Sequence, residues 1–309
     1  MTLSYHRLIR TLMLPVLLSA LAAGPAGAFG GVGDLYVTSD ASNLVRAYNG
    51  TNGTFLGNQS FGVLGSGSLG ISFGATNARY LVGSFGGGVD EYSSITGAYI
   101  KTYNPGGSWM WSAIYAPNGN VYVASMSSNS IEIYDPNTAA FIGTLCGVTG
   151  PADMRIGPNG NLYICSFFGG YVLEVNAGNG NFVSLWNTPF GEQPNDIAFL
   201  PNGEILVTAM GTNVCYRYDP AYNLIGSFAG TGWGRPHGID ISPADGNIYI
   251  ADGVSTQVHV FDPVTFAELD AAYLTPGPGD KIVDLEFRRD TLITPVEPTT
   301  WTRLKTMFK

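Results

Sequence analysis

Five polar residues of this chain have the types and positions needed to bind a cation or move a proton. Asp153, Asp196 and Asp284 each precede a short apolar segment, Asn195 stands beside Asp196, and His237 lies between a proline and a glycine. Oxygen ligands of this kind suit Ca²⁺ or another divalent cation such as Mg²⁺, and a bound metal could activate water. The alternative is structural: carboxylates that cap strand ends by accepting backbone N–H groups, and an ordinary loop histidine.

A repeat sets the positions of these side chains. A short apolar segment recurs every 41 to 45 residues. Two further kinds of residue recur with a similar spacing: an aromatic or apolar residue that is often followed by Asp-Pro, and an Ile, Met, Leu or Ala residue. Agreement among three independent markers makes chance an unsatisfactory explanation. The segments are centred on Tyr36, Leu81, Tyr122, Tyr163, Leu206 and Tyr249.

Turn sequences divide each unit into strands. Asn-Gly or Asp-Gly pairs at 118–119, 159–160, 202–203 and 245–246 precede the apolar segment and suit tight antiparallel hairpins. A unit of about 42 residues with four antiparallel strands has the length of a propeller blade. The sequence therefore predicts an all-β, six-bladed β-propeller. The chain starts on a second strand at Leu35 and ends on an inner-type strand, Val283 to Phe287, so pairing of these N- and C-terminal strands would close the ring.

Two segments carry a family resemblance. Gly234 to Pro243, followed by Asp245 to Asp252, resembles an NHL-type repeat, and shorter versions surround Asn195 and Asp153. The resemblance spans about Asp34 to Asp290. It points to the propellers of the NHL-repeat, gluconolactonase-like and virginiamycin-B-lyase-like superfamily, a scaffold that serves enzymes, scaffold proteins and ligand receptors alike.

In such propellers, the loop that enters each inner strand opens onto one mouth of a central channel. Alignment of the repeat then gives a ring of side chains, and the residue before each member gives a second ring. The first ring contains Gly70, Ser112, Asp153, Asp196, Gly238 and Asp284, and the second contains Leu69, Trp111, Ala152, Asn195, His237 and Val283. The three carboxylates are therefore expected to converge.

The resemblance also implies catalytic patterns, and both are incomplete here. Gluconolactonase-like enzymes hold a divalent metal with Asn and Asp residues, which Asn195, Asp153 and Asp196 resemble, and with an early Glu that has no match in the first unit. Virginiamycin-B-type lyases use more than one histidine, whereas His259 lies within a strand segment. A non-catalytic binding module is therefore the favoured function. The alternatives are a metal-dependent hydrolase or lactonase with His237 as acid/base, and a lyase with His237 as base.

Aromatic residues suggest where a ligand would bind. Trp109, Trp111 and Trp233 lie in segments that lead into inner strands. If they reach the same mouth, they form an apolar platform for a small molecule, a carbohydrate or a protein segment. The alternative is that the indoles wedge neighbouring blades together.

Charge and cysteine content exclude other classes. The net charge is −9, with 14 basic and 23 acidic residues, and no basic cluster in the body of the chain provides a nucleic-acid surface. Three widely spaced cysteines, Cys146, Cys165 and Cys215, fit neither a disulfide framework nor a zinc site. We expect free thiols.

The two ends differ from the repeat. Residues 1–28 combine Arg7 and Arg10, an apolar run and Ala26-Gly27-Ala28, as in a cleaved signal peptide. The propeller is expected over 29–290, and 291–309 form a spacer and a basic tail. No later stretch is long enough to span a bilayer. These features predict an exported monomer that is periplasmic, extracellular or at the cell surface.

Overall fold

The computed structural model describes residues 30–59, 66–74, 78–104, 107–189, 192–277 and 279–289, and within them the structure is all-β. The expected leader and C-terminal tail lie outside the described residues. Among the residues described, no helix is long and apolar enough to cross a membrane.

Within the described residues, 24 strands form antiparallel sheets. Four of the sheets are separate and four-stranded, in the orders β24-β1-β2-β3, β12-β13-β14-β15, β16-β17-β18-β19 and β20-β21-β22-β23. Their strands are β24 (Ile282–Phe287), β1 (Leu35–Ser39), β2 (Leu44–Tyr48), β3 (Phe55–Asn58), β12 (Pro151–Ile156), β13 (Leu162–Ser166), β14 (Tyr171–Val175), β15 (Phe182–Asn187), β16 (Pro194–Phe199), β17 (Ile205–Ala209), β18 (Val214–Tyr218), β19 (Leu224–Phe228), β20 (Pro236–Ile241), β21 (Ile248–Asp252), β22 (Gln257–Phe261) and β23 (Glu268–Asp270).

The remaining strands form one eight-stranded sheet. It contains two meanders, joined where β5 pairs with β8 through Ser84 opposite Met110 and Gly86 opposite Ser108. Its strands are β4 (Ser66–Phe73), β5 (Arg79–Gly86), β6 (Val89–Ser93), β7 (Tyr99–Tyr103), β8 (Ser108–Tyr115), β9 (Val121–Ser125), β10 (Ser130–Tyr134) and β11 (Phe141–Gly147).

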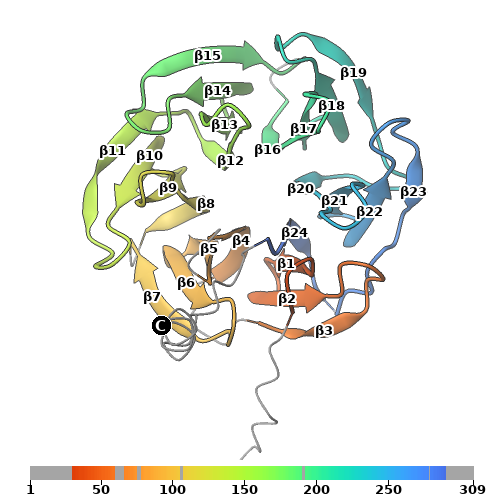
Figure 1. Ribbon diagram of the computed structural model, residues 1–309, viewed down its shortest axis with the longest axis horizontal. Helices are drawn as coiled ribbons and strands as arrows, with labels where there is room; N and C mark the ends of the chain where they lie inside the picture. Colours follow the sequence, from red (N-terminus) through yellow and green to blue (C-terminus); the bar gives the residue numbers. More distant parts are fainter. Residues whose placement is uncertain are drawn as a thin grey trace, which may run out of the picture.

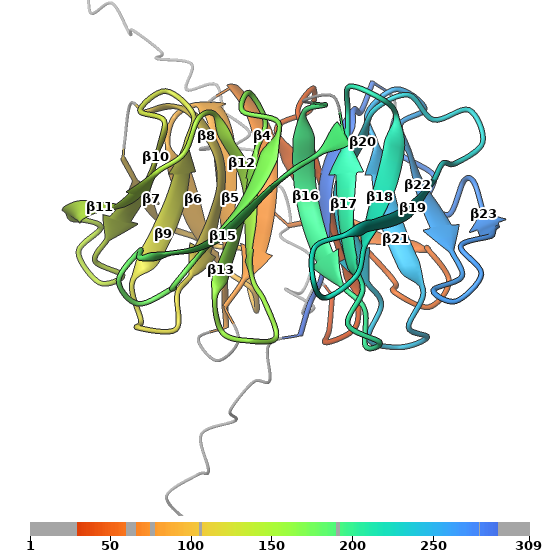
Figure 2. The same cartoon turned by 90° about the horizontal axis from the view of Figure 1, so that it is seen from above.

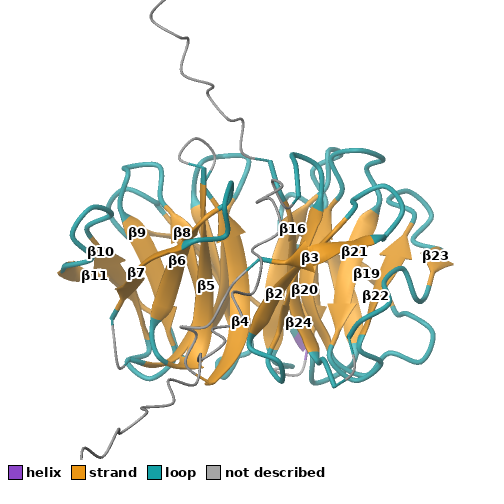
Figure 3. Cartoon of the chain, turned by 90° about the horizontal axis from the view of Figure 1, so that it is seen from below, coloured by secondary structure: helices purple, strands orange, loops and turns teal. Residues whose placement is uncertain are grey.

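The sheets stand around a common centre like the blades of a propeller (Figure 1). β4, β8, β12, β16, β20 and β24 lie innermost, and the side view shows the strands running between two rims of loops (Figures 2 and 3). β24, from the end of the chain, pairs with β1, from its beginning. The predicted strands and their order within a unit agree with this arrangement.

The turns have the geometry that their sequences predict. Gly119, Gly160, Gly203 and Gly246 have φ values of 88°, 79°, 89° and 76°, a region that glycine enters without steric cost. The Asn or Asp side chain before each glycine accepts a hydrogen bond from the backbone N–H two residues later. These Asx turns return the chain from the inner strand to the next strand.

The core lies between neighbouring sheets. It is rich in buried tyrosines, including Tyr36, Tyr80, Tyr92, Tyr122 and Tyr218, whose hydroxyls mostly find polar partners, as buried phenols require. The three cysteines are free, as expected: Cys165 and Cys215 are buried, and Cys146 is partly exposed.

Candidate functional site

A β-bulge at the start of the inner strands positions the candidate residues. The register shifts between residues 68 and 71 of β4, 110 and 113 of β8, 151 and 154 of β12, 194 and 197 of β16, and 236 and 239 of β20, and β1 shows a matching shift opposite β24. A bulge adds a residue and redirects side chains. Each bulge holds one member of each predicted ring, so the repeat places both rings at one level of the molecule.

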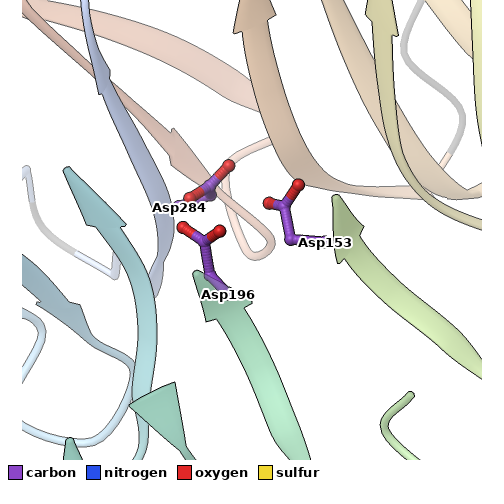
Figure 4. Close-up of side chains that lie close together, drawn as sticks. All are labelled: Asp153, Asp196 and Asp284. Carbon is purple, nitrogen blue, oxygen red and sulfur yellow. The ribbon is translucent and has the colours of Figure 1, made fainter. Parts of the chain in front are cut away.

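The structure brings together the three aspartates that the repeat alignment selects. Asp153, Asp196 and Asp284 are buried, and one oxygen of each lies within 4.8 Å of the others. They come from β12, β16 and β24 and point toward one another (Figure 4). Three carboxylates this close cannot all carry a charge without a compensating group.

These carboxylates also join neighbouring inner strands. Asp196 Oδ1 accepts the N–H of Ile197 at 2.6 Å, and its Oδ2 accepts that of Ile239 in β20 at 2.7 Å. Asp284 repeats the pattern with Leu285 at 2.8 Å and with Ile71 in β4 at 2.8 Å. Asp196 and Asp284 therefore each satisfy one backbone donor of their own strand and one of the next inner strand.

Glycine at two ring positions makes room for these contacts. A Cβ at Gly238 would lie 1.9 Å from Asp284 Oδ1, and one at Gly70 would lie 2.7 Å from Ser112 Cβ. The absent side chain at Gly238 leaves the space that Asp284 occupies. The ring member that follows Asp153 is Asp196 rather than a glycine. Asp153 accepts a hydrogen bond from the N–H of Met154 at 2.7 Å.

Burial raises the pKa of all three carboxyls. For Asp196 and Asp284 the pKa lies well above its ordinary value, first because of burial and then because of the charge on neighbouring aspartates. Burial also raises the pKa of Asp153, against the opposing effect of the Arg155 guanidinium. The cluster therefore favours protonated carboxyls.

A second set of charges, which the sequence analysis did not select, lies next to the cluster. Arg155 Nη1 donates to Asp240 at 3.0 Å, and its Nη2 lies 3.7 Å from Asp196 Oδ2. Arg289 also pairs with Asp240, at 2.7 Å. Burial raises the pKa of Glu286 to about 8. Each of these three residues lies two positions after a ring member: Arg155, Asp240 and Glu286. Because alternate residues of a strand lie on the same face, this spacing could have predicted them from the sequence.

A cavity of about 360 Å³ lies at one end of the inner strands, the same end at which His237 lies. Its walls combine aromatic, polar and charged side chains. They include Phe85, Trp109, Trp111, Phe167, Phe168, Asp40, Gln193, Arg235, His237 and Lys281. An apolar pocket with a few polar groups is the usual form of a small-molecule site.

His237 is a buried member of this wall. Its ring lies nearly parallel to that of Trp111, with an angle of 10° and centroids 6.4 Å apart. Burial lowers the pKa of His237 to about 4, so the imidazole is neutral near pH 7. Its Nδ1 atom is buried and has no hydrogen-bond partner among the described residues. A neutral ring with a free nitrogen can hydrogen-bond a ligand.

The predicted tryptophans separate into two environments. Trp109, with 45% of its surface exposed, and the buried Trp111 line the cavity. Trp233 packs instead against Phe261, with centroids 5.5 Å apart, and its indole N–H donates to Asn213 O at 2.7 Å. Trp233 therefore packs between two neighbouring sheets, the one formed by β16–β19 and the one formed by β20–β23, which is the alternative that the sequence left open.

Two other candidates lie apart from the cavity wall. Asn195 is buried beside Asp196, and its Oδ1 has no described partner. His259 is buried in β22 and contacts Glu268 Oε1 at 2.7 Å, consistent with its predicted place within a strand.

The aspartate cluster fits a hard cation in donor chemistry. Its oxygens lie within 4.8 Å of one another, and oxygens bound to one Ca²⁺ at about 2.4 Å can be as far apart as twice that distance. Asp153, Asp196 and Asp284 would hold such an ion, with Asn195 Oδ1 as a possible addition in the same bulge. The ion would supply charge compensation there, and Arg155 supplies part of that compensation already.

Comparison with known proteins adds information on the fold. No family model and no curated protein matches the chain. Among solved structures, a chain from the nidogen/laminin complex is 14% identical, with a TM-score of 0.66 over 84% of this chain and 99% of that one. A protein of unknown function from Bacteroides caccae is 15% identical, with a TM-score of 0.61 over 82% and 97%.

A third solved structure is an inactive variant of virginiamycin B lyase from Staphylococcus aureus with quinupristin. It is 11% identical to this chain, with a TM-score of 0.55 over 80% of this chain and 87% of that one. Identities this low show the fold and nothing of the activity. The chain is a β-propeller, similar in fold to all three.

Proposed function

We propose that this protein is a binding module that takes a small organic ligand into the mouth cavity, the space lined by Trp109, Trp111 and His237. The observation that carries the proposal is an aromatic-walled cavity of about 360 Å³ whose wall includes His237, a buried imidazole with an unpartnered nitrogen. Aromatic walls provide contact area, and a few polar groups orient the ligand.

The proposal includes the wider architecture. Each of the six inner strands starts one four-stranded blade, and pairing of β24 with β1 closes the ring. The support is the pairing itself, with Leu35 opposite Phe287 and Val37 opposite Leu285. We also propose that the protein acts outside the cytoplasm, on the basis of the leader sequence alone.

A fluorescent probe tests the binding function. N-phenyl-1-naphthylamine is neutral, and its emission rises in an apolar site. We expect the protein to bind it and Phe168→Ala to weaken binding about fivefold, because Phe168 lines the cavity and a buried aromatic contact contributes about 1 kcal/mol. Phe182→Ala is the matched control: Phe182 is 68% exposed on the outer strand β15. Equal affinities in all three proteins would contradict the proposal.

A metal-dependent hydrolase is the second candidate, favoured by the gathering of three carboxylates within 4.8 Å. Asp153, Asp196 and Asp284 would hold the ion, and His237 would act as acid or base. Access argues against it. The aspartates are buried, and beside them the ring members Leu69, Trp111, Ala152 and Val283 form part of one apolar core cluster.

Calorimetric titration with Ca²⁺, Mg²⁺, Mn²⁺ and Zn²⁺ separates the two functions. We expect no binding tighter than about 1 mM, because the aspartates use their oxygens to hold backbone N–H groups. Tight binding that Asp153→Asn removes would favour the hydrolase. Asp153 is the residue to change because an asparagine oxygen can still accept the backbone N–H of Met154 that Asp153 accepts now.

A further inference from the structure

The cationic side chains of the mouth cavity make no hydrogen bond or ion pair with the described residues, which is unusual in this acidic chain, and the charge of Lys281 acts on the Asp40 carboxyl. Arg235 and Lys281 line the cavity and are exposed. They are the two described Lys or Arg side chains for which the described residues provide neither a hydrogen bond nor an ion pair; every other one has such a partner. With His237 neutral, the cavity carries these two positive charges and one carboxyl, that of Asp40.

Backbone geometry singles out two other wall residues. The repeat position three residues before each of the six members of the aspartate-containing ring has a positive φ in four units, and it holds a glycine in two of these four. Gly67 and Gly150 have φ values of 71° and 57°; Trp109 and Gln193 have 57° and 47° at the same position. A residue other than glycine there costs about 1 kcal/mol or more.

Because this backbone conformation costs free energy for Trp109 and Gln193, we expect the contacts of their side chains to offset that cost. Where the position is glycine, an aromatic ring fills the space: a Cβ at Gly67 would lie 2.5 Å from Phe85, and one at Gly150 would meet Phe168. Trp109 and Gln193 instead project their own side chains at the mouth cavity, which both of them line. Strain of this kind gathers at binding sites because the surrounding structure supports it.

Two unpartnered buried atoms add polar character to the wall. Asp40 Oδ1 and His237 Nδ1 make no hydrogen bond among the described residues, and both residues line the cavity. A buried polar atom without a partner costs free energy unless a ligand or water supplies one. The wall of the cavity thus combines an aromatic platform, two cations without a hydrogen bond or ion pair, and two residues that each carry a buried polar atom without a partner.

We propose that the ligand of the mouth cavity is a planar aromatic anion, with its ring against Trp109 and Trp111 and its negative group beside Arg235 and Lys281. This inference rests on the proposed function and names the ligand class of the same site. Planar rings stack on indole faces, and an anion gains charge-assisted hydrogen bonds from Arg and Lys. The excess of cations in the wall disfavours a cationic aromatic ligand.

A matched pair of probes tests the charge. 8-Anilinonaphthalene-1-sulfonate and N-phenyl-1-naphthylamine share the anilinonaphthalene skeleton, and only the former carries a sulfonate. We expect the sulfonate to bind about tenfold more tightly in low salt, and added salt to reduce the difference. The double variant Arg235→Gln/Lys281→Gln should bring the two affinities together by weakening the sulfonate alone.

Trp109→Gly tests the strained residue. We expect at least a fivefold loss of affinity for the sulfonate, with a thermal unfolding midpoint equal to or above that of the unchanged protein, because glycine tolerates φ of 57°. Replacing a residue that serves binding at a cost in stability should lower the affinity but not the unfolding midpoint. Replacing a structural residue should lower both the affinity and the unfolding midpoint. Phe182→Ala again controls for probe bound on the exposed outer strands.

The outcomes distinguish this inference from the function beneath it. Equal affinity for both probes in the unchanged protein, with loss of both in Phe168→Ala, would overturn the anion preference and leave the binding function standing. No binding of either probe would overturn both. Sulfonate binding that Phe182→Ala removes and Trp109→Gly does not would place the probe outside the cavity and overturn the inference.

Discussion

Gly238→Ala is expected to destabilise the protein by about 3 kcal/mol or more, an effect far larger than a methyl group normally has in a strand. The added Cβ would lie 1.9 Å from Asp284 Oδ1 and 2.8 Å from both Asp284 Cα and Leu285 N. The carboxylate cannot simply turn away, because it holds the N–H groups of Leu285 and Ile71. Relief therefore requires either a backbone shift or two lost hydrogen bonds.

Urea unfolding measures this loss from the shift in midpoint at constant slope. Gly143→Ala in β11 is the matched control, since a Cβ there would meet nothing within 4 Å. The double variant Gly238→Ala/Asp284→Ala locates the cause. If the carboxylate is the obstacle, Gly238→Ala costs less in the Asp284→Ala background. A Gly238→Ala protein as stable as the parent would contradict the packing described for the ring.

The sequence predicted the aspartate ring because a repeat converts sequence position into spatial position. Asp153, Asp196 and Asp284 occupy one position of the repeat, and equivalent positions of equivalent strands lie at the same height around a common centre. Distances and protonation could not be predicted in this way. They depend on the bulges, and on Gly238, whose missing side chain admits Asp284.

The tryptophans show the limit of such reasoning. A position in a loop does not say which way a side chain turns, so Trp233 was grouped with Trp109 and Trp111 as a ligand platform. The indole N–H of Trp233 instead donates a hydrogen bond to Asn213 O. The left-handed backbone of Trp109, by contrast, was detectable: Gly67 and Gly150 occupy its repeat position, and that substitution pattern is visible in the sequence.

The stability of the folded protein should fall as the pH rises from 6.5 to 8.5, by about 2 kcal/mol for a carboxyl such as Glu286 whose pKa is about 8 in the folded state. Folding raises the pKa of Asp196 and Asp284 well above the ordinary value, and that of Glu286 to about 8. In this range the folded protein holds protons that the unfolded chain has already released. The stabilisation is complete below the unfolded pKa values near 4 and is lost as the pH passes the folded ones.

The pH window separates these carboxyls from His237 and from the cysteines. Below pH 6.5, the lowered pKa of His237, about 4, acts in the opposite direction, because the unfolded chain gains a proton that the buried imidazole does not. Above pH 9, the three cysteines contribute, because burial raises the pKa of Cys146 to about 11 and raises the pKa values of Cys165 and Cys215 further. Urea midpoints at pH 6.5, 7.5 and 8.5, with EDTA present to remove divalent cations, therefore report mainly on the cluster and its neighbour Glu286.

Asp153→Asn should flatten this dependence and raise stability at pH 8.5 by about 1–2 kcal/mol, because it removes one of three crowded carboxyls while its amide oxygen still accepts the Met154 N–H. The control is Asp245→Asn, an exposed turn residue that thereby acquires the Asn-Gly sequence found in other units. It should leave the slope unchanged. Stability that is flat or rising across this range in EDTA would show that the cluster ionises freely in the folded state. Charge compensation, to which Arg155 contributes, would then stabilise three ionised carboxylates, and the protonated carboxyls inferred from their burial would not exist.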